Sequence, residues 1–195
     1  MTMPAQPLGG HLAQLLGPLP TPAASLCAAA RCLRPQKGEV LLREGERWQQ
    51  LWWVAHGAFR LYYLDLDGQA SNKNFFLDGA MFWPITPDLS AKPVAFWIEA
   101  MEAGEVWALP WADWSVAMQG FLPWQDLERR VLTMLLQDKM QREQHFLQRS
   151  ATQRYQALLS THADWVKRIP LRQLASYLGV TDVALSRIRR RLKSD

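Results

Sequence analysis

The segment with the clearest chemical potential lies near the carboxyl end, where positive side chains cluster. Five of the seven residues 187–193 are Lys or Arg. Guanidinium and ammonium groups at this density are typical of surfaces that bind the phosphates of a polyanion. The alternative interpretation is a solvated helix end, because positive charge is favourable near a helix C-terminus. The residues that precede the cluster distinguish between the two interpretations.

Residues 171–190 have the residue types that two crossed helices joined by a tight turn require. Pro170 suits the first turn of a helix, and Gly179 can adopt the positive φ that ends one. Thr181 can cap the second helix, and Ala175 is small where the helices must cross closely. The shared core is expected to contain Leu174, Leu178, Val180, Leu185 and Ile188. The pattern predicts a helix-turn-helix and favours DNA as the polyanion.

Placing the second helix in a major groove assigns roles to individual side chains. Arg187 is the first candidate for base contact, because a guanidinium can donate two hydrogen bonds to O6 and N7 of guanine. The full set of expected base contacts is Thr181, Asp182, Val183, Ser186, Arg187 and Arg190. Further cations are expected to neutralise phosphates without reading sequence, namely Arg172, Arg189, Arg191 and Lys193.

The charge along the chain supports a specialised C-terminal module. The 195 residues carry a formal net charge of +4, but residues 1–150 carry −2 and residues 151–195 carry +6. This polarity indicates a near-neutral body with a module for nucleic acid or, as a second choice, for an anionic membrane surface. No apolar run approaches the roughly 18 residues of a membrane span. We therefore expect a soluble, cytoplasmic protein without a signal peptide.

The body of the chain is expected to be rich in β-structure. A helical lead-in occupies residues 1–36, with short helices at 12–16 and 23–33. Short β-rich runs between turn signals then fill residues 37–122 and predict a small antiparallel β-barrel or sandwich. The runs are 40–42, 51–54, 59–66, 74–77, 96–100 and 105–109. Asp67-Gly68 is expected to form a hairpin turn.

A long helix is expected at residues 123–148, before the segment 149–195 that carries the helix-turn-helix. Leu127, Val131, Met134 and Leu135 recur at steps of three and four. A helix of about 25 residues is roughly 37 Å long, more than one face of a small barrel needs. Pairing with a second copy is therefore open beside packing on its own barrel. Residues 150–153 fit a capping box that starts a further helix.

The order of these segments resembles the Crp/Fnr transcriptional regulators over about residues 30–193. The resemblance implies an α+β fold with a cyclic-nucleotide-binding-like β-barrel, a dimerisation helix and a C-terminal DNA-binding domain. We expect a homodimer paired through residues 124–148 that binds an imperfect palindrome in double-stranded DNA. The motifs that carry the resemblance are Lys37-Gly38-Glu39, Glu44-Gly45-Glu46, Gly57 with Arg60, Asp67-Gly68, Ile98-Glu99-Ala100 with Glu105-Val106, and residues 150–155 and 169–188.

The sequence departs from the cAMP-responsive members at the phosphate site. Those members hold the cyclic phosphate with Gly-Glu followed by Arg-Ser or Arg-Thr, whereas Val94-Ala95 stands in the second slot here. A phosphate buried against these residues would be an unpaired charge, so we expect no cAMP binding. Lys92 can substitute only after a shift in register. In the second helix of the motif, Val183 replaces the Glu of many members and can contact a thymine methyl.

Aromatic residues are concentrated in the β-rich segment. Nine of the ten tryptophans lie between Trp48 and Trp124. Ordinary core filling is the favoured interpretation. An apolar or aromatic effector held in an aromatic cage, and a barrel packed solid without ligand, are the alternatives. The candidate effector contacts are Phe82, Trp83, Phe96 and Trp97.

Enzyme and metal chemistry have little support in the residue types. The barrel segment has a single histidine, His56, too few for a histidine-based metal centre. Cys27 and Cys32 cannot form a disulfide framework or a four-thiolate cluster. We therefore expect no catalysis, no cofactor and no metal. The alternative function is a binding module for a small molecule or a protein, built on the aromatic barrel and without DNA binding.

Overall fold

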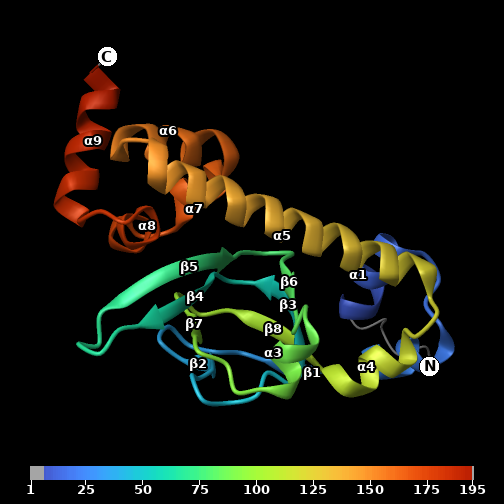
Figure 1. The fold of residues 1–195 in the computed structure, drawn as a ribbon. Helices are drawn as coiled ribbons and strands as arrows, with labels where there is room; N and C mark the ends of the chain where they lie inside the picture. Colours follow the sequence, from blue (N-terminus) through green and yellow to red (C-terminus); the bar gives the residue numbers. More distant parts are fainter. Residues whose placement is uncertain (1–6, 195) are drawn as a thin grey trace. The chain divides into compact units, whose positions relative to one another are not determined.

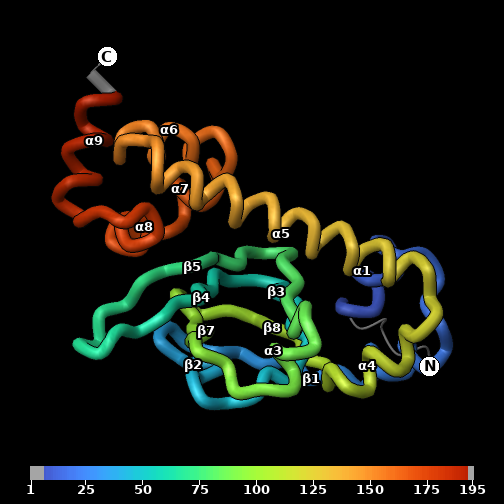
Figure 2. The backbone as a smooth tube through the Cα atoms, viewed as in Figure 1, coloured from blue at the N-terminus to red at the C-terminus, as the bar shows by residue number. Residues whose placement is uncertain are grey.

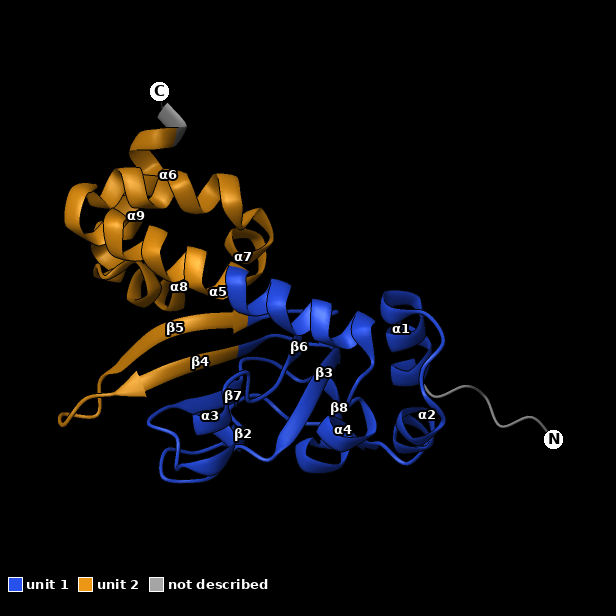
Figure 3. Cartoon of the chain, turned by 45° about the vertical axis from the view of Figure 1, so that its right-hand side comes forward, with its two compact units in different colours: residues 1–59, 76–133 blue, residues 60–75, 134–195 orange. Residues whose placement is uncertain are grey.

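A computed structural model describes residues 7–194 of the chain, with side chains up to Leu192. Its contacts divide the chain into two compact units, coloured separately in Figure 3. Unit 1 comprises the residues up to 59 and residues 76–133, and unit 2 comprises residues 60–75 and 134–195. Residues 60–75, expected as part of the β-rich segment, thus group with the C-terminal helices.

The β-strands form two four-stranded sheets, shown in Figure 1. The first sheet has the order β1-β8-β3-β6, and its pairs are antiparallel. The second has the order β2-β7-β4-β5. The strands are β1 (Arg31–Leu33), β2 (Val40–Leu42), β3 (Gln50–His56), β4 (Phe59–Leu64), β5 (Ala70–Phe76), β6 (Met81–Phe82), β7 (Trp97–Ala100) and β8 (Glu105–Pro110). The β-rich architecture expected from the sequence is confirmed.

The predicted helix at 23–33 is too long, because its last residues form a strand. Helix α2 (Thr21–Ala28) ends before β1, and β1 pairs with β8 from Arg31 opposite Ala108 to Leu33 opposite Val106. Pairing with a distant strand outweighs the local helical preference here. The other helices of unit 1 are α1 (Pro7–Leu16), α3 (Pro87–Ala91) and α4 (Trp111–Ala117).

Alternation along β3 separates two aromatic clusters inside unit 1. Successive side chains of a strand point to opposite faces. Trp52 therefore packs with Trp48 and Phe82, at ring-centroid distances of 5.8 and 5.4 Å. Its neighbour Trp53 stacks on His11 of α1, 4.8 Å away, in a core that also contains Trp83, Trp114 and Trp124.

Helix α5 (Leu122–Gln148) is the long helix expected from the sequence, and its path is traced in Figure 2. Trp124, in its first turn, packs edge-on against Trp114 of α4. The next helix, α6 (Ala151–Thr161), begins with the predicted capping box. The Ser150 hydroxyl accepts the Gln153 N–H at 3.3 Å, and the Gln153 Oε1 accepts the Ser150 N–H at 2.9 Å.

Unit 2 continues with α7 (Ala163–Arg168), α8 (Leu171–Leu178) and α9 (Asp182–Ser194). The same unit holds the hairpin formed by most of β4 and most of β5. Its turn is closed by the Gly68 N–H, which donates to the Asp65 carbonyl at 3.0 Å. Asp67-Gly68 thus lies in the predicted hairpin turn, and Gly68 has a φ of +76°.

Candidate DNA-binding surface

The turn between α8 and α9 has the local geometry that the sequence predicts. Helix α8 begins after Pro170 and ends at Gly179, whose φ of 66° and ψ of 40° are left-handed. The Val180 N–H donates to the Ala175 carbonyl at 3.0 Å, which satisfies an otherwise orphaned carbonyl at the helix end. Thr181 then accepts the Ala184 N–H on its hydroxyl at 3.2 Å and caps α9. The two helices therefore form a helix-turn-helix.

Apolar residues from both helices fix how they cross. Leu174, Ala175 and Leu178 of α8 and Leu185 of α9 are buried. Tyr155 and Leu158 of α6, together with Ile169, are further buried residues of unit 2. Ile188 and Val180, also expected in the core, are half-buried. Because the apolar sides of α8 and α9 are occupied in this way, the remaining sides face outward.

The outward side of α9 carries the side chains proposed for base contact. Within the described residues, the Arg187 guanidinium is exposed and makes no hydrogen bond or ion pair. Asp182 accepts the N–H of Val183 and so serves the first turn of α9. Ser186 is half-buried. The exposed members of the set are Thr181, Asp182, Val183, Arg187 and Arg190.

The cations assigned to phosphates lie in different settings. Arg172 is exposed in the first turn of α8, whereas Arg189 is half-buried. Arg191 is exposed, and its Nη2 donates to the Thr152 hydroxyl of α6 at 3.3 Å. The side chain of Lys193 lies outside the described residues. The structure therefore gives positions for three of the four.

Two arginines to which the sequence assigned no contact, Arg142 and Arg154, bind backbone carbonyls in unit 2. Arg154 donates from Nε to the Leu178 carbonyl at 3.2 Å and from Nη1 to the Arg149 carbonyl at 3.1 Å. Arg142 is half-buried, and this burial lowers its pKa because burial disfavours the charged form. A count of positive residues along the sequence assigns both arginines to a basic surface. No sequence pattern shows that their guanidinium groups instead bind backbone carbonyls of the protein itself.

The charge of the chain is concentrated in unit 2. Residues 60–75 and 134–195 contain 14 Lys and Arg against seven Asp and Glu, a net charge of +7. The rest of the chain contains eight against 11, a net charge of −3. The positive net charge therefore lies in the unit that contains the helix-turn-helix.

The four candidate effector contacts do not form one site. Phe82 and Phe96 belong to the aromatic cluster around Trp48, at ring-centroid distances of 6.3 and 5.8 Å from it. Trp83 packs instead against Trp124, 5.2 Å away in the other core. Trp97 is half-buried. Phe82 is the last residue of β6 and Trp83 follows the strand, and the two neighbouring side chains pack in different aromatic clusters.

Val94, the residue that the sequence comparison is expected to place at the phosphate slot of cAMP-responsive members, is apolar and buried. Both of its backbone polar groups are paired. Its N–H donates to the Glu46 carbonyl at 2.8 Å, and its carbonyl accepts the Gly45 N–H at 2.9 Å. The backbone of this slot therefore has its hydrogen bonds satisfied within the protein.

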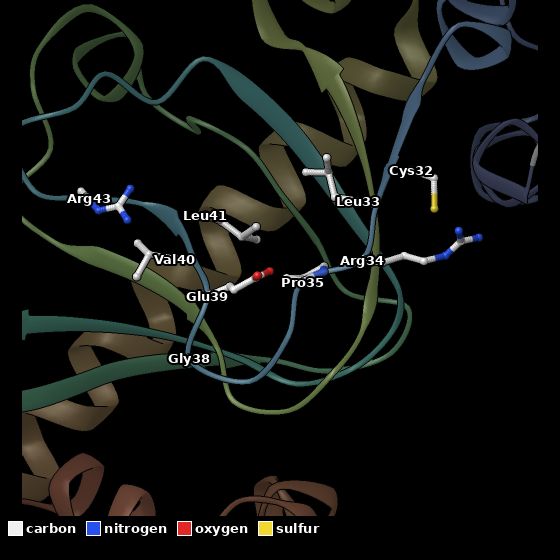
Figure 4. A pocket seen from close by; sticks show the side chains of 9 residues that line it. All are labelled: Cys32, Leu33, Arg34, Pro35, Gly38, Glu39, Val40, Leu41 and Arg43. Atoms are coloured by element: carbon white, nitrogen blue, oxygen red, sulfur yellow. The ribbon is translucent and has the colours of Figure 1, made fainter.

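An open pocket of about 620 Å³ lies at β1 and β2 and is shown in Figure 4. Cys32, Arg34 and Glu39 are among its lining residues. Arg34 forms an ion pair with Glu105 at 3.4 Å.

Burial and the nearby Glu105 carboxylate raise the pKa of Cys32, and burial raises the pKa of Cys27 to about 11. Both thiols are therefore held in the protonated form.

The described residues add two findings about metals and membranes. In residues 7–194, no group of three or more His, Cys, Asp or Glu side chains has the arrangement of a metal site. Within the same range, no helix combines the length and the apolar content needed to cross a membrane.

Comparison with known proteins places this geometry in a fold family. Residues 33–120 match the family model of the cyclic nucleotide-binding domain. The structure is similar to FixK2 from Bradyrhizobium japonicum, with a TM-score of 0.71, 19% identity and 85% of each chain covered. It is also similar to a Eubacterium rectale protein assigned to the Crp/Fnr regulators, with a TM-score of 0.68 and 18% identity over 90% of this chain and 84% of the other. The chain has the fold of the Crp/Fnr regulators.

A third similar structure is that of the c-di-GMP-responsive global regulator CLP from Xanthomonas campestris. Its TM-score is 0.66 at 16% identity, and the match covers 95% of this chain and 92% of CLP. No curated protein matches the sequence. The expected resemblance to Crp/Fnr proteins is confirmed for the fold, including the β-rich segment, the long helix and the C-terminal helices.

Proposed function

We propose that this chain is a sequence-specific DNA-binding transcription regulator of the Crp/Fnr type, acting in the cytoplasm. One observation carries the proposal: the side of α9 that faces away from α8 is exposed to solvent. The turn that precedes α9 is left-handed at Gly179 and is capped by Thr181. Arg187 is exposed on this side of α9, and Leu185 on the opposite side is buried. The base contacts are assigned to Thr181, Asp182, Val183, Ser186, Arg187 and Arg190.

The proposed regulator acts as a homodimer through α5. The helix has 27 residues, a length of about 40 Å at 1.5 Å per residue. Leu132, Leu136 and Met140 follow one another at steps of four and are 47%, 57% and 62% exposed. Apolar side chains that recur along one side of a helix are the residues that pair with a second helix. Pairing of two copies then sets their α9 helices about 34–36 Å apart, which is one turn of the duplex. The two helices would bind the two half-sites of an imperfect palindrome.

We infer that the barrel does not take cAMP. Val94 is buried at the phosphate slot, and a cyclic phosphate placed there has no cation from that slot to pair with. Trp48, Trp52, Phe82 and Phe96 are all buried and pack on one another, so they serve as core. The proposed regulator is not an enzyme, and its DNA binding needs no cAMP.

Binding of the full chain to duplex DNA at several salt concentrations tests the proposal. A pool of random duplexes is first enriched by repeated selection, which yields the operator. Affinity for that operator is then expected to fall steeply with salt, because each neutralised phosphate releases counterions. Addition of cAMP is expected to leave the affinity unchanged. Absence of duplex binding at low salt would refute the regulator function, and enrichment of no common sequence would refute its specificity.

A further inference from the structure

The β4–β5 hairpin is fastened to the first helix of the helix-turn-helix by hydrogen bonds inside unit 2. The Asn72 N–H donates to the Ser176 hydroxyl at 3.0 Å, and this hydroxyl donates to the Ala70 carbonyl at 2.9 Å. The Asn72 Nδ2 donates to the Gln173 carbonyl at 3.0 Å and to the Gln173 Oε1 at 2.7 Å. Two alternate residues of β5 thus bind two successive turns of α8.

Arg142 ties α5 to the same junction. Its Nη1 donates to the Lys73 carbonyl at 3.0 Å, and its Nη2 donates to the carbonyls of Asn72 and Tyr177 at 3.1 and 2.9 Å. The guanidinium carbon also lies 4.2 Å from the centre of the Tyr177 ring. The planar guanidinium of Arg142 therefore links α5, the helix on which it lies, to both β5 and α8.

We call Asn72, Arg142, Gln173 and Ser176 the latch. Asn72 is only 2% exposed, and its Oδ1 has no hydrogen-bond partner. A buried polar group with an unpaired atom costs free energy, so the latch is a poor source of stability. The hydrogen bonds of the latch instead form only when β5 and α8 have one position relative to each other. The arrangement is typical of a device that fixes geometry.

The latch leaves the outer side of α9 uncovered. Val183 and Arg187 are exposed while the hairpin is bound to α8. The latch residues on α8 are half-buried on the side toward the hairpin. The latched arrangement is therefore compatible with α9 entering a groove.

We propose that the latch fixes the orientation of the helix-turn-helix on the end of α5 and thereby sets the half-site spacing that the dimer accepts. The inference rests on the proposed DNA binding and makes Asn72 and Ser176 positioning residues. When one α9 of the dimer is bound, a rigid connection between the two DNA-binding segments holds the second α9 at a high effective concentration near the second half-site. A loose connection lowers this effective concentration and allows binding to half-sites at other separations.

The test compares the full chain with the double variant Asn72→Ala, Ser176→Ala on operators of changed spacing. The duplexes are the selected operator, versions with one or two base pairs added or removed between the half-sites, and a single half-site. Ser71→Ala is the matched control, because Ser71 is the exposed neighbour of Asn72 on β5. Thermal melting of each protein establishes that it is folded.

The wild type and Ser71→Ala are expected to prefer one spacing by about tenfold or more. The double variant is expected to bind the preferred operator about tenfold more weakly than the wild type does. It is expected to bind the operators of altered spacing nearly as tightly as it binds the preferred one. Its affinity for the single half-site is expected to equal that of the wild type. A lost contact with DNA would weaken the half-site as well and would overturn the positioning role.

An unchanged spacing preference in the folded double variant would overturn the inference. If the double variant does not fold, Ser176→Ala alone replaces it, since this change removes one hydroxyl and two hydrogen bonds, and an unchanged preference then has the same meaning. Failure of the wild type to bind any duplex overturns the proposed function itself, which distinguishes the two failures.

Discussion

Replacement of Gly179 by alanine tests the turn on which the DNA-binding surface depends. Gly179 has a φ of 66°, a conformation that costs a residue with a Cβ about 1–2 kcal/mol. A Cβ at this position would also lie 2.7 Å from Cε1 of Phe146 at the end of α5. The Phe146 ring therefore has to move, because a real Cβ contact is not this short.

The cost of moving the ring follows from what it contacts. The guanidinium carbons of Arg154 and Arg142 lie 4.9 and 5.4 Å from the ring centre. Phe146 is 42% exposed, so each of these contacts is worth about 0.5–1 kcal/mol. Gly179→Ala is therefore expected to destabilise unit 2 by about 2–4 kcal/mol in the wild type, the sum of the backbone strain and the two contacts. In a Phe146→Ala background, only the backbone strain of about 1–2 kcal/mol remains.

Urea unfolding of the four proteins of this cycle, followed by circular dichroism, measures the difference. Gly68→Ala is the matched control, because Gly68 has a φ of +76° and a Cβ there meets nothing within 4 Å. Its cost is expected to be the same with and without Phe146. An equal cost of Gly179→Ala in both backgrounds would refute the ring contact, and a neutral Gly179→Ala would refute the left-handed turn.

Two further predictions concern recognition and pH. Arg187→Ala is expected to lower affinity for the selected operator by about 1–3 kcal/mol and to change affinity for random duplex far less, whereas Lys193→Ala weakens both alike. Competition gel shifts measure this, and equal losses for Arg187→Ala would exclude a base contact. Burial lowers the pKa of His162 and outweighs the opposite effect of Asp138. The unfolded chain then binds the proton more readily, so stability is full above the ordinary pKa of about 6.5 and falls as the pH drops below it. His162→Gln should remove part of this fall between pH about 7.5 and pH about 5 in urea unfolding, and an unaltered pH dependence would contradict the assignment.

The sequence by itself determined the features that depend on neighbours within a few residues. Gly179 ends α8 in a left-handed conformation, and Thr181 caps α9. The Ser150 capping box begins α6. Each of these signals acts through hydrogen bonds to backbone groups no more than five residues away, so residue type and spacing are sufficient to predict it. The helix-turn-helix and its candidate contacts follow from such signals.

Only the tertiary structure decided which distant segments meet. Asn72 bonds to Gln173 and Ser176 across more than 100 residues, and Arg142 reaches Asn72 across 70. Nothing in the local pattern of β5 distinguishes its buried asparagine from an exposed one. The strand at Arg31–Leu33 likewise exists because β8 pairs with it. Such contacts depend on how whole helices and strands pack against each other. The free energy of this packing depends on residues of both segments, so the sequence of one segment alone does not predict it.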